Sequence, residues 1–198
     1  MIARLSKRMA SFFVRNEVIK SEDEEVYEYG LQLLLSTIIN GMIALILAIF
    51  TGTIFQCICY LAVFVLLRKS AGGFHAKTHF GCCCILVVVL SLFIMFIKIV
   101  PNEAYGIVAA ITVSFSVVII LIFAPLEHEN KPISDRDRSK LRKNSVIYAV
   151  LLTILILVLF IVKLKIIMIC IALGMFTSSS SMLVAVIEKR TNSIHLRT

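Results

Sequence analysis

Long apolar runs alternate with short polar segments along most of this chain. Six runs can be followed, and they group into three pairs that cover residues 30–67, 82–124 and 145–187. A short polar break splits each pair: Thr51-Gly52-Thr53, Pro101-Asn102-Glu103 and Lys163-Leu164-Lys165. A helix needs about 20 apolar residues to cross a bilayer core. Because lipid offers backbone groups no partner and the runs lack a barrel's alternation, we predict six transmembrane helices in three hairpins.

The first twenty residues follow a different pattern. Ile2, Leu5, Met9, Phe12 and Phe13 recur at helical spacing, with basic residues between them. These charges interrupt the apolar stretch that a cleavable signal peptide needs. The pattern predicts an amphipathic helix in an arm of residues 1–20 that lies on an anionic membrane surface, with a plain basic tail as the alternative.

Composition supports the membrane class. Hydrophobic residues make up 60% of the 198 residues, and mean hydropathy is +0.99, whereas a soluble domain is about 45–50% apolar. The chain is therefore predicted to be an all-α integral membrane protein, with residues 1–198 in one domain and the lipid bilayer as a partner.

The net charge of +8 indicates membrane topology in such a chain, and we expect no nucleic-acid partner. Basic residues gather in the arm, in residues 68–80, in the loop 125–144 and in the tail 188–198. The positive-inside rule then predicts that both termini and both long loops are cytoplasmic. Lys163 and Lys165, at the last hairpin tip, argue weakly against this orientation.

The segment 68–84, RKSAGGFHAKTHFGCCC, concentrates histidine and cysteine between two apolar runs. Three hypotheses fit it: a thiol nucleophile with its base, a metal site, or a structural loop in which the cysteines act as small apolar residues. Cys82 lies at the predicted start of a helix, where the macrodipole favours a thiolate. Three adjacent cysteines do not easily bind one ion, and no CxxC spacing is present, so we expect no metal ion and no cofactor.

Two histidines could serve Cys82 as a base. His79 is three residues away, which places both side chains on one face of a helix. His75 is seven residues away, about 10 Å along a straight helix, so it reaches Cys82 only if the chain folds back. Gly72, Gly73 and Gly81 permit such a path. Geometry alone leaves both histidines open.

The residues Arg68, Gly72-Gly73, His75-Ala76 and Cys82 form the pattern R-x3-G-G-x-H-A-x5-C. This pattern resembles the AgrB (accessory gene regulator protein B) family, membrane cysteine endopeptidases of bacterial quorum sensing. The similarity covers nearly the whole chain, including the basic amphipathic start, the six apolar runs and a loop with Asn130-Lys131-Pro132. It implies that His75, in a cytoplasmic catalytic segment 68–81, is the base and that Cys82, at the start of the next apolar run, is the nucleophile. It also implies a protein of the bacterial plasma membrane.

The resemblance also implies a substrate and a product. AgrB-type proteins cut an AgrD-type propeptide on its C-terminal side at the cytoplasmic face. A cysteine inside the peptide then attacks the thioester of the acyl-enzyme, which yields a cyclic thiolactone.

By the same resemblance, Gly72 and Gly73 shape the turn that returns His75 to Cys82. Arg68 holds a peptide carbonyl or carboxylate, or else snorkels at its helix end. Lys131 and its basic loop attract an acidic propeptide tail, or serve only as the topology signal. The neighbouring Cys83, Cys84 and His79 are interpreted as packing or loop residues.

A function of another class stays open. The polar residues 177–181 in the last run are typical of close helix packing, and alternatively they could line a cavity. The second use would suit a small non-enzymatic transporter or peptide exporter, although no run carries a midplane carboxylate or an evident inverted repeat. The chain does not indicate its oligomeric state, and a homodimer stays open as well.

Overall fold

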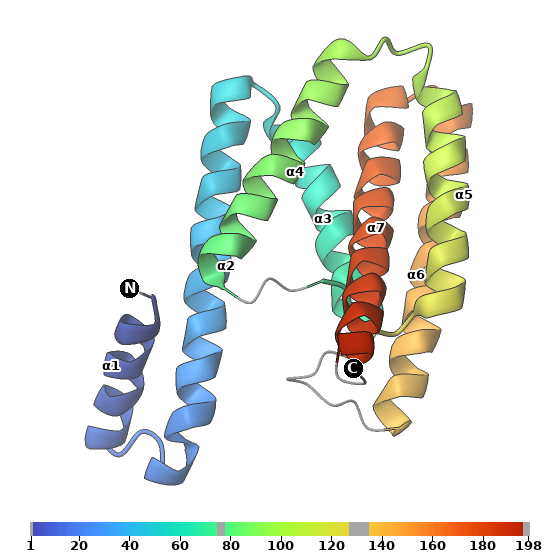
Figure 1. Cartoon of the computed structure of the whole chain (residues 1–198). Helices are drawn as coiled ribbons and strands as arrows, with labels where there is room; N and C mark the ends of the chain where they lie inside the picture. The colour runs from blue at the N-terminus through green and yellow to red at the C-terminus, as the bar shows by residue number, and fades with distance from the viewer. Residues whose placement is uncertain (1, 75–77, 127–134, 196–198) are drawn as a thin grey trace.

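The computed structural model describes residues 2–74, 78–126 and 135–195, and these residues contain helices and no strand (Figure 1). The elements in chain order are α1 (Ile2–Arg15), the short 3-10 helix η1 (Ser21–Asp23), α2 (Glu24–Thr51), α3 (Ile54–Ala71), α4 (His79–Ile99), α5 (Tyr105–Phe123), α6 (Asp135–Ile161) and α7 (Lys165–His195). Six of the helices, α2 to α7, are long and apolar enough to cross a membrane. The predicted all-α fold, with six transmembrane helices and an additional N-terminal helix, is confirmed.

Several helices extend further than the apolar runs. α6 begins at Asp135, so residues 136–143 belong to a helix, whereas the sequence predicted a loop as far as residue 144. Arginine, lysine and leucine are good helix formers, and neither glycine nor proline interrupts residues 135–161. α3 likewise continues to Ala71, α4 begins before Cys82 and α7 continues past Ile187. The polar segments beside the runs are therefore shorter than predicted.

α7 is the central helix of a four-helix group with α3, α5 and α6 (Figure 1). Of its apolar window, 56% is buried inside the protein, the largest share of the six. Gly174 allows this packing, because a Cβ atom there would lie 2.8 Å from the Tyr60 carbonyl oxygen on α3. A small residue at such a contact lets two helix backbones approach closely, as is common in membrane bundles.

α2 and α4 form a second packed layer beside α3. Their apolar core includes Ala44, Ala48, Leu90 and Phe93, and the Phe93 ring stacks on Tyr60 with 4.1 Å between ring centroids. α4 leans towards α2 and diverges from α5 below the tip that joins them (Figure 1). The second predicted hairpin is thus connected at its tip, while most of α4 packs elsewhere.

The outer surface of the helices is apolar. Phe50, Ile107 and Ile161 are 86%, 70% and 76% exposed, and many similar side chains surround the bundle. Soluble monomers rarely expose large contiguous apolar patches, whereas lipid is a suitable solvent for them. Together with the six long apolar helices, this surface identifies a multi-pass membrane protein.

The three hairpin tips lie at one end of the molecule, and α1, the start of α6 and the end of α7 lie at the other (Figure 1). α1 packs beside α2 through Ser6 and Ala10, which are fully buried. The hydroxyl of Ser11 donates a hydrogen bond of 2.6 Å to Glu24 Oε1 at the start of α2. The segments rich in basic residues thus share one end of the structure.

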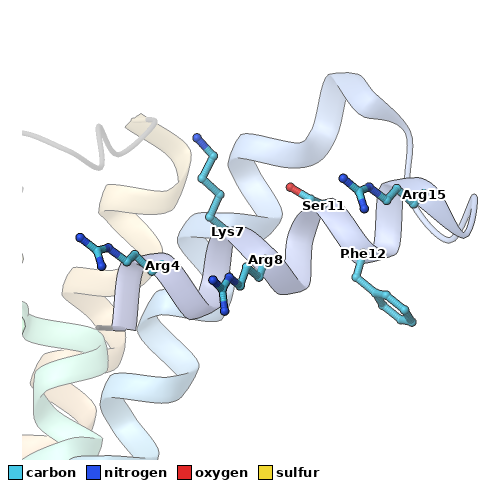
Figure 2. A pocket seen from close by; sticks show the side chains of 6 residues that line it. All are labelled: Arg4, Lys7, Arg8, Ser11, Phe12 and Arg15. Atoms are coloured by element: carbon cyan, nitrogen blue, oxygen red, sulfur yellow. The ribbon is translucent and has the colours of Figure 1, made fainter.

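The exposed surface of α1 has a basic side and an apolar side. Figure 2 shows Lys7, Ser11 and Arg15 projecting to one side of the helix and Phe12 to the other. Phe12 is 61% exposed and Leu5 is 48% exposed. This division fits the predicted amphipathic helix at a membrane surface.

We expect Gly174→Ala to destabilise the protein by about 1–3 kcal/mol, because the added methyl group would overpack the contact with the Tyr60 carbonyl. Thermal unfolding of the detergent-solubilised protein, followed by size exclusion after heating, measures the effect. Gly30→Ala is the matched control, since nothing lies within 4 Å of a Cβ atom there. Equal thermal stability of the two variants would contradict the proposed packing.

Candidate active site around Cys82

A glycine turn follows α3 and starts the segment that contains the motif. Gly72 has φ of 80° and Gly73 has φ of 151°, conformations that L side chains rarely adopt. A Cβ atom at Gly72 would lie 2.6 Å from the Leu126 carbonyl oxygen, and one at Gly73 would lie 2.7 Å from Ser181 Oγ. The turn is also tied to the segment after α5, because the Leu126 N–H donates to the Ala71 carbonyl over 3.0 Å. Both backbone conformation and space therefore require glycine here.

Arg68 links the glycine turn to α7. Its Nη1 donates to Ser181 Oγ over 3.0 Å, its Nη2 donates to the Phe74 carbonyl, and its guanidinium lies 5.4 Å from the centre of the Phe64 ring. The Phe74 N–H also donates to Ser181 Oγ over 3.1 Å. The guanidinium thus binds a carbonyl of its own chain. Sequence reasoning had not singled out Ser181 individually, and the only signal was its place in the polar group 177–181.

Cys82 lies in the first turns of α4. Thr78 is the N-cap, and its Oγ1 accepts a hydrogen bond of 3.1 Å from the Gly81 N–H. The Thr78 carbonyl accepts a second one of 3.1 Å from the Cys82 N–H. Thr78 therefore fixes the backbone of Gly81 and of Cys82, the predicted nucleophile.

The thiol of Cys82 contacts an amide on another helix. Asn40 Nδ2 donates to Cys82 Sγ over 3.6 Å, and the thiol of Cys83 donates to Asn40 Oδ1 over 2.9 Å. Asn40 and Cys82 are both partly buried. The sequence had indicated Cys83 as a packing or loop residue, and this hydrogen bond gives it a polar contact beside Cys82.

The contact also gives the depth of Cys82 in the bundle. Asn40 lies near the middle of α2, about 16 Å along the axis from Thr51 at 1.5 Å per residue. A bilayer core is about 30 Å thick. Cys82 therefore lies well inside the apolar part of the bundle.

The described residues of the predicted site thus lie in two clusters. Arg68 and the glycine turn bond to Ser181 of α7, and Cys82 bonds to Asn40 of α2. His75 and Lys131 lie outside the described residues. In the described ranges, no group of three His, Cys, Asp or Glu side chains could hold a metal ion.

The polar residues 177–181 of α7 mostly bond to neighbouring helices. The Tyr60 hydroxyl donates to Thr177 Oγ1 over 2.8 Å, and Ser179 Oγ donates to Ser116 Oγ over 3.1 Å. Ser178 Oγ is buried and has no hydrogen-bond partner among the described residues. These contacts indicate that residues 177–181 serve to pack helices together rather than to line a cavity.

Comparison with known proteins identifies relatives of this chain by sequence. The model of the accessory gene regulator B family matches residues 6–185. An AgrB-like protein of Listeria innocua is 28% identical over 153 residues, which cover 75% of this chain and 74% of the relative. AgrB-like protein 2 of Clostridium perfringens is 27% identical over 153 residues, 74% of this chain and 71% of the relative. No solved structure matches. The chain therefore belongs to the AgrB family.

Proposed function

We propose that this protein is a membrane cysteine endopeptidase that cleaves an AgrD-type propeptide and promotes closure of a thiolactone ring. Membership of the AgrB family points to quorum-sensing propeptide processing. The observation that carries the finer proposal is the setting of Cys82, which lies in the first turn of α4 and accepts a hydrogen bond from Asn40 of α2. Catalytic cysteines often lie at helix N-termini beside polar partners.

In this mechanism, His75 takes the proton of the Cys82 thiol as the sulfur attacks the scissile carbonyl, and His75 then gives this proton to the departing amine. The contacts of Phe74 support the assignment of His75, because the residue directly before it is held by Arg68 and Ser181 between α3 and α7. A base has to be held in place to act, and this anchored turn is a rigid start for the segment that carries it.

Ring closure requires that water stays away from the acyl-enzyme. Exchange of one thioester for another is nearly isoenergetic, whereas hydrolysis runs strongly downhill. The depth of Cys82, beside the middle of α2, supports a site with little water. Holding the peptide's own thiol next to the thioester can lower the barrier by up to roughly 7–11 kcal/mol in ideal cases.

We also propose that both termini face the cytoplasm. The basic residues of α1 and of the first turns of α6 lie at the end of the bundle opposite the hairpin tips (Figure 1), in agreement with the positive-inside rule. Lys131 would add to this basic surface and attract an acidic propeptide tail. The alternative of a non-enzymatic exporter has lost its main support, because residues 177–181 mostly bond to neighbouring helices.

Cys82→Ser and His75→Ala should each reduce release of the C-terminal fragment of a co-expressed AgrD-type propeptide by at least about 10³-fold, as expected for a nucleophile and its base. Mass spectrometry of the peptide measures this release. Cys84→Ser is the matched control, because Cys84 is exposed, and it should cleave like the wild type. Undiminished cleavage by Cys82→Ser would show that another residue is the nucleophile.

Arg68→Lys should reduce cleavage by about 10–100-fold, because a lysine keeps the charge but cannot bond both Ser181 and Phe74 in the same geometry. Ser181→Ala removes one partner and should have a smaller effect in the same direction. The initial rate of cleavage in membranes measures both. Lys69→Arg is the control, because it replaces one basic residue by another at the adjacent exposed position. A loss of cleavage rate as large as that of Arg68→Lys would argue against a specific role for the Arg68 contacts.

The orientation can be tested by labelling with a membrane-impermeant maleimide. Asn102→Cys, at the tip between α4 and α5, should react in intact cells. Ser139→Cys, in the first turns of α6, should react only after the cells are permeabilised. Site-resolved mass spectrometry separates these positions from the native cysteines, and the reverse pattern would mean that the termini face outward.

A further inference from the structure

Attack of Cys82 on a peptide bond creates a negatively charged oxygen that needs hydrogen-bond donors. In cysteine and serine peptidases, backbone N–H groups beside the nucleophile commonly supply them. Here the Cys82 N–H already donates to the Thr78 carbonyl, and the Gly81 N–H already donates to Thr78 Oγ1, each over 3.1 Å. The backbone donors at and before the nucleophile are therefore occupied by the N-cap.

The side chain that contacts Cys82 from the neighbouring helix α2 is a donor. Asn40 Nδ2 lies 3.6 Å from Cys82 Sγ. An amide nitrogen carries two hydrogens, so one can bond the sulfur while the other is available. When the sulfur bonds to a carbonyl carbon, the oxygen of that carbonyl comes within hydrogen-bond reach of a donor at this distance.

The direction of the Asn40 amide is fixed by Cys83. The Cys83 thiol donates to Asn40 Oδ1 over 2.9 Å, and this contact assigns the oxygen end of the amide to Cys83 and the NH2 end to Cys82. Polar side chains inside a membrane bundle are costly and usually serve a function. Asn40 lies in an apolar helix, near its middle, and its amide contacts the two adjacent cysteines.

We propose that Asn40 is the oxyanion donor of the site and that Cys83 is the positioning residue that orients it, an inference that rests on the proposed peptidase function. The Cys82 sulfur forms a bond to the scissile carbonyl carbon, and the carbonyl π electrons move to its oxygen, which Asn40 Nδ2 stabilises. The electrons then return to re-form the carbonyl, the carbon–nitrogen bond breaks, and the amine leaves with the proton from the general acid. The product is a thioester on Cys82.

Asn40→Leu should lower the single-turnover rate of propeptide cleavage by about 10²–10³-fold, as loss of one oxyanion donor does in other peptidases, with little change in KM. The ratio of variant to wild-type rates is measured between pH 6 and 9.5. A loss that is constant across this range supports a donor to the transition state. A loss that disappears at high pH would mean that Asn40 acts only on ionisation of the thiol, and would overturn the proposal.

A second pair of variants leaves Asn40 in place. Cys83→Ser keeps a donor to Asn40 Oδ1 and should cleave within about 3-fold of the wild type, whereas Cys83→Ala frees the amide and should lose about 10-fold. Equal rates for the two variants would contradict the orienting role of Cys83.

The outcomes for the proposed function and for the oxyanion donor can be told apart. If the wild type cleaves and a fully expressed Asn40→Leu variant is equally active, Asn40 is not the oxyanion donor and the proposed peptidase function is retained. A wild-type protein that fails to cleave would refute the proposed function itself.

Discussion

Close packing of α3 against α7 is the constraint on which the rest of the structure depends. Gly174 brings the α7 backbone against the Tyr60 carbonyl, and the Tyr60 ring in turn stacks on Phe93 of α4. One tyrosine is thus part of the interface with α7 on one side and with α4 on the other. The helix that carries Cys82 is positioned through this residue, at a distance from the thiol itself.

The site combines two small polar clusters held by different helices. Arg68, Phe74 and Ser181 join α3, the glycine turn and α7, while Asn40, Cys82 and Cys83 join α2 and α4. Because lipid cannot solvate these groups, the members of each cluster form hydrogen bonds with one another, and this requirement helps to determine how the helices are placed.

The sequence predicted the helices well, since their apolar length is a strong signal that does not depend on tertiary contacts. It placed their ends less well: basic residues such as Arg138 and Arg142 are compatible with both a loop and a helix, and here they extend α6. It also predicted Arg68, Gly73 and Cys82 from one motif. It could not single out Asn40 or Ser181 as partners of these residues, because both are distant in sequence and become neighbours only when α2 and α7 pack beside the segment.

The depth of Cys82 has a consequence for the choice of substrate. A peptide bond that reaches the middle of α2 brings its flanking side chains below the membrane surface. Each charged side chain carried to the centre of a bilayer costs about 2.5–3.5 kcal/mol on insertion scales, which corresponds to roughly 60- to 300-fold in occupancy. For the proposed peptidase, this cost favours peptides with small or apolar residues at the bond to be cut, whose charges lie far enough along the chain to remain in water.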